Sequence, residues 1–288
     1  MPKVFVYGTL LKRMSRSSVL DNSLYYGLAI IEADLYNLGS YPGIKQGDGC
    51  VVGEIYEVSQ QTGKELDEIE GYDFHYHQDS LFIREEVEAC SLSYGAKIDC
   101  YVYCYNGDFY NAKIIQHGDY RRFLMEKDSS SKQWIISYGS NMSSGRIAER
   151  VGEVTHSQTG YLDDFELVFN KKAFQHDSAR ANIRCNEGIR CPAVAWELSK
   201  EQINQLDRYE GTPSHYMRIA LPFITRNGLL PAQGYIAHPS RLMEGLTIEP
   251  TYWEHIREGY EEHGFQEHVM ALRERQPASG FETQGSVL

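Results

Sequence analysis

A motif of six residues occurs twice in this chain of 288 residues and constrains its fold more than any other feature. Residues 66–71 read LDEIEG, and residues 206–211 read LDRYEG. At the same distance upstream of each motif, IYEVS at 55–59 matches AWELS at 195–199. Spaced matches in a constant order are hard to obtain by chance, so we interpret the chain as an internal duplication.

The two copies also match near their beginnings and beyond the motif. VFVYGTL at 4–10 corresponds to WIISYGSN at 134–141, and the HY pair at 75–76 corresponds to the HY pair at 215–216. Between the copies, residues 126–133 read EKDSSSKQ, a polar and serine-rich composition typical of a surface linker. We therefore expect a first domain at 1–127, a linker at 128–133, a second domain at 134–275 and a flexible tail at 276–288.

The pattern within each copy indicates an α+β fold in which strands dominate. An apolar strand runs into a Tyr-Gly turn, and a helix is expected directly after it, at 10–20 in the first copy and at 143–150 in the second. Further strands are expected at 28–36 and 51–58, where apolar residues alternate. Helical spacing of apolar residues after position 250 predicts two more helices.

A further helix is predicted immediately before each Glu-Gly pair. Ser59 and Ser199 are suitable N-caps, and Gln202 completes a Ser-x-x-Gln capping box in the second copy. Gly71 and Gly211 can adopt the left-handed conformation that ends many helices. These signals place Glu70 and Glu210 at helix C-termini.

Composition and charge exclude several classes of function. The net charge is −12, and both copies are acidic, so we expect no nucleic-acid partner. No apolar run approaches the ~20 residues that cross a bilayer, and the N-terminal residues carry no leader pattern, so we expect a cytoplasmic protein without membrane contact. The sequence gives no signal for an oligomeric state.

The six cysteines give no indication of a metal site. They form no CxxC pair and have no histidine partners at zinc-ligand spacing, so we expect reduced, mostly buried thiols and no bound metal.

The Tyr-Gly turns are the first candidate for chemistry. Tyr7, Gly8, Thr9 and Leu10 in the first copy correspond to Tyr138, Gly139, Ser140 and Asn141 in the second. A turn of this kind directs backbone N–H groups toward an anion or a carbonyl oxygen. Taken alone, the glycine could equally serve only to permit a tight turn.

The glutamates at the helix ends are the second candidate. The macrodipole is negative at a helix C-terminus, which favours a raised pKa for a carboxyl group there. Asp67 and Asp207, one turn earlier, would raise the pKa further if they point the same way. Such a glutamate suits a general base near neutral pH, although an isolated Glu-Gly pair is more often an ordinary surface feature.

The order of these motifs resembles the γ-glutamylcyclotransferase superfamily over residues 3–275. The first copy resembles the γ-glutamylamine cyclotransferase (AIG2-like) branch in its segments 4–11, 41–43, 52–56, 70–72 and 117–121. The second resembles the γ-glutamylcyclotransferase branch proper in 138–142, Arg146, 210–211 and 215–218.

The resemblance implies two tandem domains, each a small mixed β-barrel with flanking helices. It also implies a reaction in which the α-amine of a γ-glutamyl amide attacks its own δ-carbonyl, releasing 5-oxoproline and a free amine. The substrate would be a small-molecule or peptide-linked γ-glutamyl amide, with Glu70 and Glu210 as general acid/base and no cofactor or metal. The residues implied to bind it are Tyr7, Gly8, Thr9, Leu10, Tyr138, Gly139, Ser140, Asn141, Tyr76 and Tyr216.

The first copy departs from the family pattern after its HY pair. Seven residues, 77–83, separate Tyr76 from Arg84, whereas a single residue separates Tyr216 from Arg218. Glu210 is therefore the stronger candidate for an active base. Two alternatives stay open: a binding protein in which one or both pockets are non-catalytic, and a hydrolase of γ-glutamyl amides.

Overall fold

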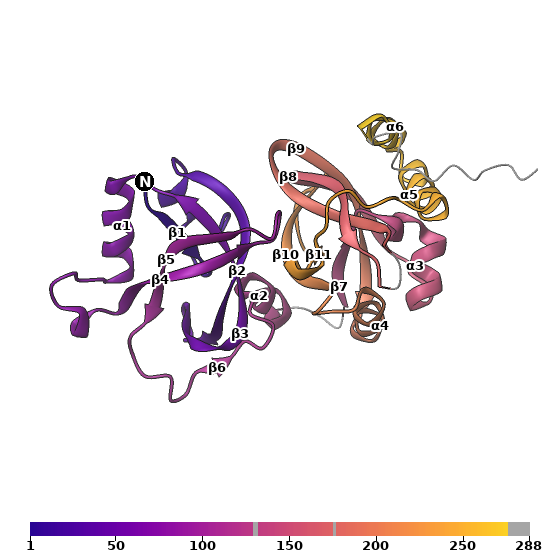
Figure 1. Ribbon diagram of the computed structural model, residues 1–288. Helices are drawn as coiled ribbons and strands as arrows, with labels where there is room; N and C mark the ends of the chain where they lie inside the picture. The colour runs from indigo at the N-terminus through magenta and orange to yellow at the C-terminus, as the bar shows by residue number, and fades with distance from the viewer. Residues whose placement is uncertain (129–131, 175–176, 276–288) are drawn as a thin grey trace, which may run out of the picture. The chain divides into compact units, whose positions relative to one another are not determined.

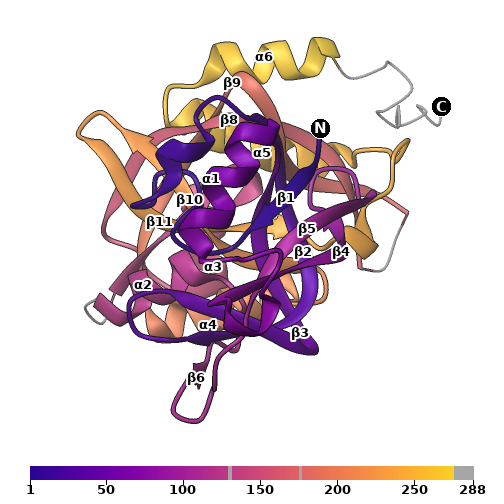
Figure 2. The same cartoon turned by 90° about the vertical axis from the view of Figure 1, so that its left-hand side faces the viewer.

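The chain divides into two compact units, Met1–Lys127 and Asp128–Leu288. The computed structural model describes residues 1–128, 132–174 and 177–275, and we describe each unit by itself (Figures 1 and 2). Within these ranges no helix is both long and apolar enough to span a membrane.

The first unit is a closed barrel of five strands. Around the barrel the strands follow the order β3–β1–β5–β4–β2, and β2 pairs again with β3 to close it, while the short β6 pairs with β2. The pairing of β1 with β5 is parallel. The elements are β1 Lys3–Val6, a 3₁₀ helix Ser17–Leu20, β2 Leu24–Asn37, β3 Pro42–Glu57, α1 Gln60–Glu70, a 3₁₀ helix His77–Asp79, β4 Phe82–Ser91, β5 Lys97–Tyr105, β6 Lys113–Ile114 and α2 Tyr120–Asp128.

The second unit repeats this barrel. Its strands follow the closed order β10–β11–β7–β9–β8, and β7 pairs with β11 in parallel, as β1 does with β5. Two C-terminal helices are added, as the sequence predicts. The elements are β7 Lys132–Ser137, a 3₁₀ helix Ser140–Met142, α3 Ser144–Val151, β8 Ser157–Lys172, β9 Ala179–Ser199, α4 Lys200–Glu210, β10 Tyr216–Thr225, β11 Gly228–Ala237, a 3₁₀ helix Pro239–Arg241, α5 Pro250–Glu262 and α6 Gln266–Arg275.

Alternation along the first strand builds two apolar layers. Phe5 and Tyr7 pack into one buried cluster with residues of β2, β3 and β5. Val4 and Val6 pack into the other, which includes Leu66 of α1. Because successive side chains of a strand point to opposite faces, β1 contributes both to the barrel interior and to the layer that holds α1 against it.

The helices before the Glu-Gly pairs begin and end as the sequence predicts. Ser59 accepts a hydrogen bond from the N–H of Thr62, and Ser199 forms the capping box with Gln202. Gly71 and Gly211 adopt left-handed φ values of 62° and 66°. Glu70 and Glu210 are accordingly the last residues of α1 and α4.

Two local predictions differ from the structure. The segment 10–20 forms turns and only a short 3₁₀ helix at Ser17–Leu20, and the positive φ of 68° at Arg13 breaks any continuous helix there. Helix α2 extends to Asp128 and β7 begins at Lys132, so regular structure occupies both ends of the segment expected to be a linker. The tail predicted at 276–288 lies outside the described residues.

Gly71, the C-cap of α1, and Gly63, inside the helix, should respond in opposite ways to substitution by alanine. Gly71→Ala places a Cβ on left-handed backbone and 3.2 Å from the Cβ of Leu81, so we expect a loss of about 1–2 kcal/mol in stability. Gly63 lies inside the helix, and a Cβ added there would meet open space, so Gly63→Ala should raise the stability by ~0.5–1 kcal/mol. Urea denaturation of the full chain, followed by circular dichroism, measures both; unchanged or increased stability of Gly71→Ala would contradict the capping role of Gly71.

Candidate active site

The first barrel holds a pocket of about 100 Å³ between the turn after β1 and the C-terminus of α1. Glu70 lines it together with four residues singled out in the sequence: Tyr7, Gly8, Thr9 and Leu10. The remaining lining residues are mostly apolar, among them Tyr41, Pro42, Leu81, Phe82 and Tyr103.

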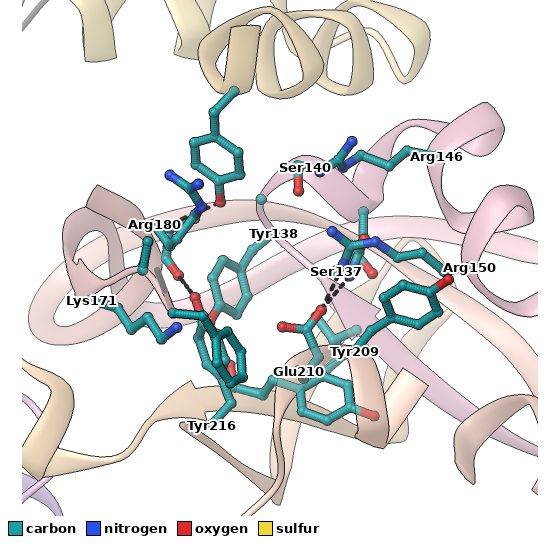
Figure 3. A pocket seen from close by; sticks show the side chains of 18 residues that line it. Ser137, Tyr138, Ser140, Arg146, Arg150, Lys171, Arg180, Tyr209, Glu210 and Tyr216 are labelled. Carbon is teal, nitrogen blue, oxygen red and sulfur yellow. Dashed lines mark hydrogen bonds and ion pairs between the residues drawn. The ribbon is translucent and has the colours of Figure 1, made fainter. Parts of the chain in front are cut away.

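The second barrel holds a larger pocket, of about 260 Å³, in the same place (Figure 3). Glu210 and Tyr216 line it together with the turn after β7, which comprises Tyr138, Gly139, Ser140 and Asn141. Each turn therefore lines the same pocket as the glutamate that follows it by roughly 60–70 residues.

The glycine of each turn is required by close packing. A Cβ on Gly8 would lie 2.8 Å from Cγ of Pro42, and a Cβ on Gly139 would lie 2.8 Å from the Cβ of Ala181. Real Cβ atoms do not approach other atoms so closely, so any side chain here would push the turn away from the neighbouring strand. The close approach keeps the backbone of each turn at the pocket wall.

The tyrosine before each glycine forms part of the pocket wall. The Tyr7 hydroxyl donates to the backbone carbonyl of Tyr103 at 2.6 Å, and the Tyr138 hydroxyl donates to that of Tyr235 at 2.5 Å. Burial raises the pKa of both phenols well above their ordinary value, so both stay protonated. Their rings face the pocket while their hydroxyls tie β1 and β7 to the parallel neighbouring strand.

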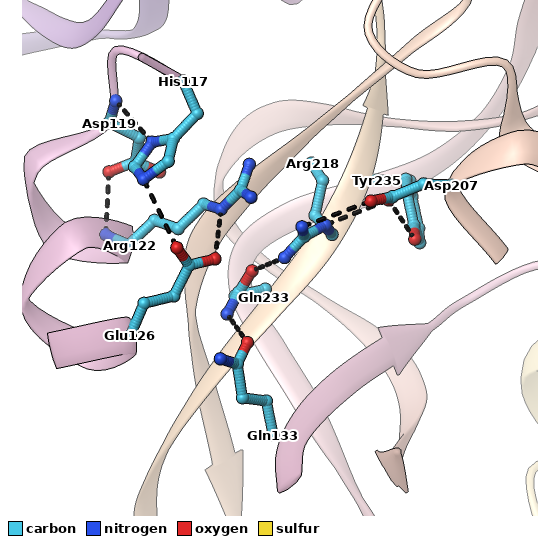
Figure 4. Close-up of polar contacts among 9 residues, drawn as sticks. All are labelled: His117, Asp119, Arg122, Glu126, Gln133, Asp207, Arg218, Gln233 and Tyr235. Atoms are coloured by element: carbon cyan, nitrogen blue, oxygen red, sulfur yellow. Dashed lines mark hydrogen bonds and ion pairs between the residues drawn. The ribbon is translucent and has the colours of Figure 1, made fainter. Parts of the chain in front are cut away.

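The aspartate one turn before each glutamate anchors its helix to the barrel. Asp67 accepts hydrogen bonds from Arg84 at 2.9 Å and from the Tyr103 hydroxyl at 2.7 Å. In the second barrel, Asp207 accepts from Arg218 at 3.0 Å and from Tyr235 at 2.7 Å (Figure 4). Both aspartates are paired with arginine, and Asp67 is not among the causes of the Glu70 pKa shift, so the condition under which Asp67 would raise that pKa is not met.

The seven residues that separate Tyr76 from Arg84 do not disrupt the pairing of Arg84 with Asp67 in the first barrel. Residues 77–79 form a 3₁₀ helix before β4, and Arg84 then meets Asp67 as Arg218 meets Asp207. Phe82, two residues before Arg84, occupies the place of Tyr216 and lines the pocket. Tyr76, the counterpart expected from the HY match, is 67% exposed and does not line the pocket. The inserted residues shift the register, which sequence matching alone does not reveal.

The two glutamates have different electrostatic environments. Burial raises the pKa of Glu70 to about 7, and Arg16 opposes this rise. Oε1 of Glu210 instead accepts hydrogen bonds from Arg150 and from Asn141, both at 2.9 Å. The first pocket therefore holds a carboxyl group that titrates near neutrality, whereas the second holds one fixed in place by two donors.

Several residues of the second pocket were missed by sequence reasoning. Lys171 and Arg180 come from β8 and β9, and Tyr252 comes from α5, whose Gly259 lies close enough to Met142 that a Cβ would be 2.7 Å away. The Tyr252 hydroxyl accepts from the N–H of Ala181 at 3.0 Å. These residues belong to no motif, and the closure of the barrel together with the docking of α5 brings them to the pocket.

Comparison with known protein families identifies the same domain twice in the chain. The family described as "Gamma-glutamyl cyclotransferase, AIG2-like" matches residues 4–122 and again residues 135–255. The chain belongs to this family. Both copies match it, so the duplication joins two members of one family.

Each individual relative aligns with a stretch of this chain that is no longer than one of its two copies. YtfP of Escherichia coli K12, named as a γ-glutamylcyclotransferase family protein, is 29% identical over 41% of this chain and 95% of its own length. The γ-L-glutamyl-butirosin B γ-glutamyl cyclotransferase of Niallia circulans is 36% identical over 38% of this chain and 70% of its own length. A match to YtfP of Citrobacter rodentium, at 41% identity, spans 58% of that protein.

The tandem arrangement has a counterpart among solved structures. YkqA from Bacillus subtilis superposes with a TM-score of 0.73 over 96% of this chain and 98% of its own. The sequences are 19% identical, so this likeness concerns the fold of two tandem barrels.

The raised pKa of Glu70 should make stability depend on pH. The native barrel binds this proton more tightly than the unfolded chain does, so the stabilisation is present at low pH and is lost as the pH rises through about 7. The uncharged Glu70→Gln does not undergo this loss. Its free energy of unfolding, relative to that of the wild type, should therefore rise by roughly 1–3 kcal/mol when the pH is raised from 5 to 8. Urea denaturation at both pH values tests this, with the exposed Glu68→Gln as control. A pH-independent difference would contradict the shifted pKa.

Proposed function

We propose that the protein is a γ-glutamyl cyclotransferase that releases 5-oxoproline from γ-glutamyl amides in both barrels. The observation that carries this proposal is the repeated pairing of one partly buried glutamate with a Tyr-Gly turn in a single pocket: Glu70 with Gly8, and Glu210 with Gly139. The names of the relatives support the reaction class, and their amide substrates support a small-molecule or peptide-linked γ-glutamyl amide.

The chemistry needs one carboxylate and good positioning. The α-amine of the glutamyl group attacks its own δ-carbonyl carbon, a new C–N bond closes the five-membered ring, and the original amide C–N bond breaks. The attacking α-ammonium loses a proton and the departing amine gains one. We assign this transfer to Glu70 and Glu210 as general acid/base. Because the nucleophile belongs to the substrate, holding it near the carbonyl supplies much of the rate.

The turns are suited to hold the oxygen atoms of the glutamyl group. The residues of the segments 8–10 and 139–141 line the two pockets, and the close packing of Gly8 and Gly139 holds both turns in place. Fixed backbone donors stabilise the negative charge that develops on a carbonyl oxygen during the attack. Tyr7 and Tyr138 give the pocket a rigid side wall.

The two glutamates should be separable by mutation. Glu70→Gln and Glu210→Gln each keep the size of the side chain but remove the base, so each should lower the 5-oxoproline release of its own barrel by about 10²–10⁴-fold. The double variant should lose the activity altogether, and the exposed Glu68→Gln should retain it.

Mass spectrometry of 5-oxoproline, with a panel of γ-glutamyl amides at neutral pH, measures this loss. A double variant as fast as wild type would refute the assignment of the base. Binding of the amides by wild-type protein without any turnover would instead support a pocket that is not catalytic.

The remaining activity of Glu210→Gln should report the titration of Glu70. A general base acts in its deprotonated form, and the pKa of Glu70 is raised to about 7 by burial. The kcat/KM of this variant should therefore rise about ten-fold between pH 6 and pH 8 and level off above. A flat profile over this range would show that Glu70 is not the group whose ionisation limits the rate.

A further inference from the structure

The loop that follows β1 is held at one residue by both of its backbone groups. The N–H of Lys12 donates to Oε2 of Glu54 at 2.7 Å, and the carbonyl of Lys12 accepts from Nη1 of Arg121 at 3.4 Å. Glu54 and Arg121 also form an ion pair with each other, with 3.0 Å between Oε1 and Nη1. One ion pair, formed between β3 and α2, therefore fixes the backbone on both sides of Lys12.

This ion pair is largely buried. The side chain of Glu54 is 2% exposed and that of Arg121 is 14% exposed. Oε2 of Glu54 also accepts from the Tyr56 hydroxyl at 3.0 Å, whereas Nε of Arg121 is buried and finds no hydrogen-bond partner among the described residues. Burying two charges costs hydration, and a pair with an unsatisfied donor seldom offsets this cost. Stability alone therefore does not account for the pair.

The second barrel has a buried valine at the place of Glu54. In the pairing of β1 with β3, Glu54 lies opposite Val6, the residue before the first Tyr-Gly turn. In the pairing of β7 with β9, Val194 lies opposite Ser137, the residue before the second turn. The same barrel thus forms with an apolar residue here, so the fold itself does not require the charge.

Helix α5 supports the turn of the second barrel. Nε2 of His263 lies 2.9 Å from the carbonyl oxygen of Met142, and Gly259 packs so closely that an added Cβ would lie 2.7 Å from the Cβ of Met142. Different contacts therefore support the turns of the two copies, and the contacts of the first can be changed by themselves.

The loop fixed at Lys12 reaches the first pocket at both of its ends. The N–H of Arg16 donates to the carbonyl of Thr9 at 2.9 Å, which closes residues 9–16 into a loop with Lys12 near its middle. Thr9 and Arg16 both line the pocket. The loop forms turns without a continuous helix, so its position depends on contacts made outside it.

We propose that Glu54 and Arg121 are positioning residues for the reaction in the first barrel. By fixing Lys12 they keep both ends of the loop at the pocket, beside Glu70. Neither residue lines the pocket, so both act through the loop. This inference rests on the proposed cyclotransferase function and adds to it the interaction that orients one wall of the first site.

A paired substitution removes the interaction without leaving a single buried charge. Arg121→Met alone would leave Glu54 buried without its partner, which is strongly destabilising, whereas Glu54→Met with Arg121→Met replaces both by apolar side chains. In the full chain with Glu210→Gln, only the first barrel keeps its base. There the paired substitution should lower kcat about 10- to 100-fold and change KM by less than about three-fold, because the reacting groups are bound but less well oriented. The substrate is the amide of the panel that Glu210→Gln converts fastest.

The pH profile distinguishes this role from a general loss of structure. Among the described residues that line the first pocket, Arg16 and Glu70 are the charged side chains. Burial raises the pKa of Glu70 and Arg16 opposes this rise, so a displaced loop should move the acid limb of kcat/KM to higher pH. A merely destabilised barrel would lose activity without moving the acid limb.

Two single substitutions complete the test. Arg122→Met removes the same charge from the adjacent residue of α2, which pairs with Glu126 at 2.7 Å (Figure 4), and should keep both kcat and the acid limb. Arg121→Lys keeps a cation opposite Glu54 but not the planar group that serves two acceptors, so it should fold and show the same changes to a smaller degree. A wild-type kcat and acid limb in Arg121→Lys and in the paired variant would refute the inference.

Hydrogen exchange separates this inference from the proposed function. Measured by mass spectrometry on the full chain, the amides of residues 9–16 should exchange about ten-fold faster in the paired variant than in wild type, with α1 unchanged. Faster exchange of the loop in a protein whose wild type releases no 5-oxoproline would refute the cyclotransferase alone. Turnover by the paired variant at the rate of its parent, with the exchange of the loop unchanged, would refute the positioning role alone.

Discussion

The pairing of a helix aspartate with an arginine and a tyrosine of two neighbouring strands organises each barrel. Asp67 accepts hydrogen bonds from Arg84 of β4 and Tyr103 of β5. In the second barrel, Asp207 accepts hydrogen bonds from Arg218 and Tyr235 in the same way. The interaction fixes the rotation of α1 and α4 against the sheet. Since the glutamate follows the aspartate by three residues, less than one helical turn, this rotation decides that its carboxyl group lies at the pocket.

The same frame supports two different electrostatic environments. In the first pocket a carboxyl group is buried beside apolar and aromatic side chains, and its pKa rises to about 7. In the second pocket the equivalent group is held by Arg150 and Asn141, and further cations surround it. A duplicated fold therefore keeps its scaffold while the pocket walls, which the scaffold interactions do not restrict, diverge in charge.

Local signals predicted much of the fold and part of the site. The repeat, the caps at Ser59 and Ser199 and the left-handed glycines locate the helices, because each depends on residues within a few positions of one another. The helix predicted over 10–20, directly after the Tyr-Gly turn, is wrong because Arg13 has a positive φ and turns the chain there. Tyr76 was misplaced because an inserted segment shifted the match, and strand pairing, which assigns Phe82 to that place, is a long-range property.

The sequence by itself determined the duplication, the family resemblance and the two glutamates at helix ends, since these follow from motif order and short-range capping. The tertiary structure decided which other side chains share a pocket with those glutamates. Lys171 and Arg180 lie on neighbouring strands, and Tyr252 lies about 70 residues further on. Barrel closure and the docking of α5 bring them together, and burial then lowers the pKa of Lys171. Burial is a property of the assembled fold, so no local pattern encodes it.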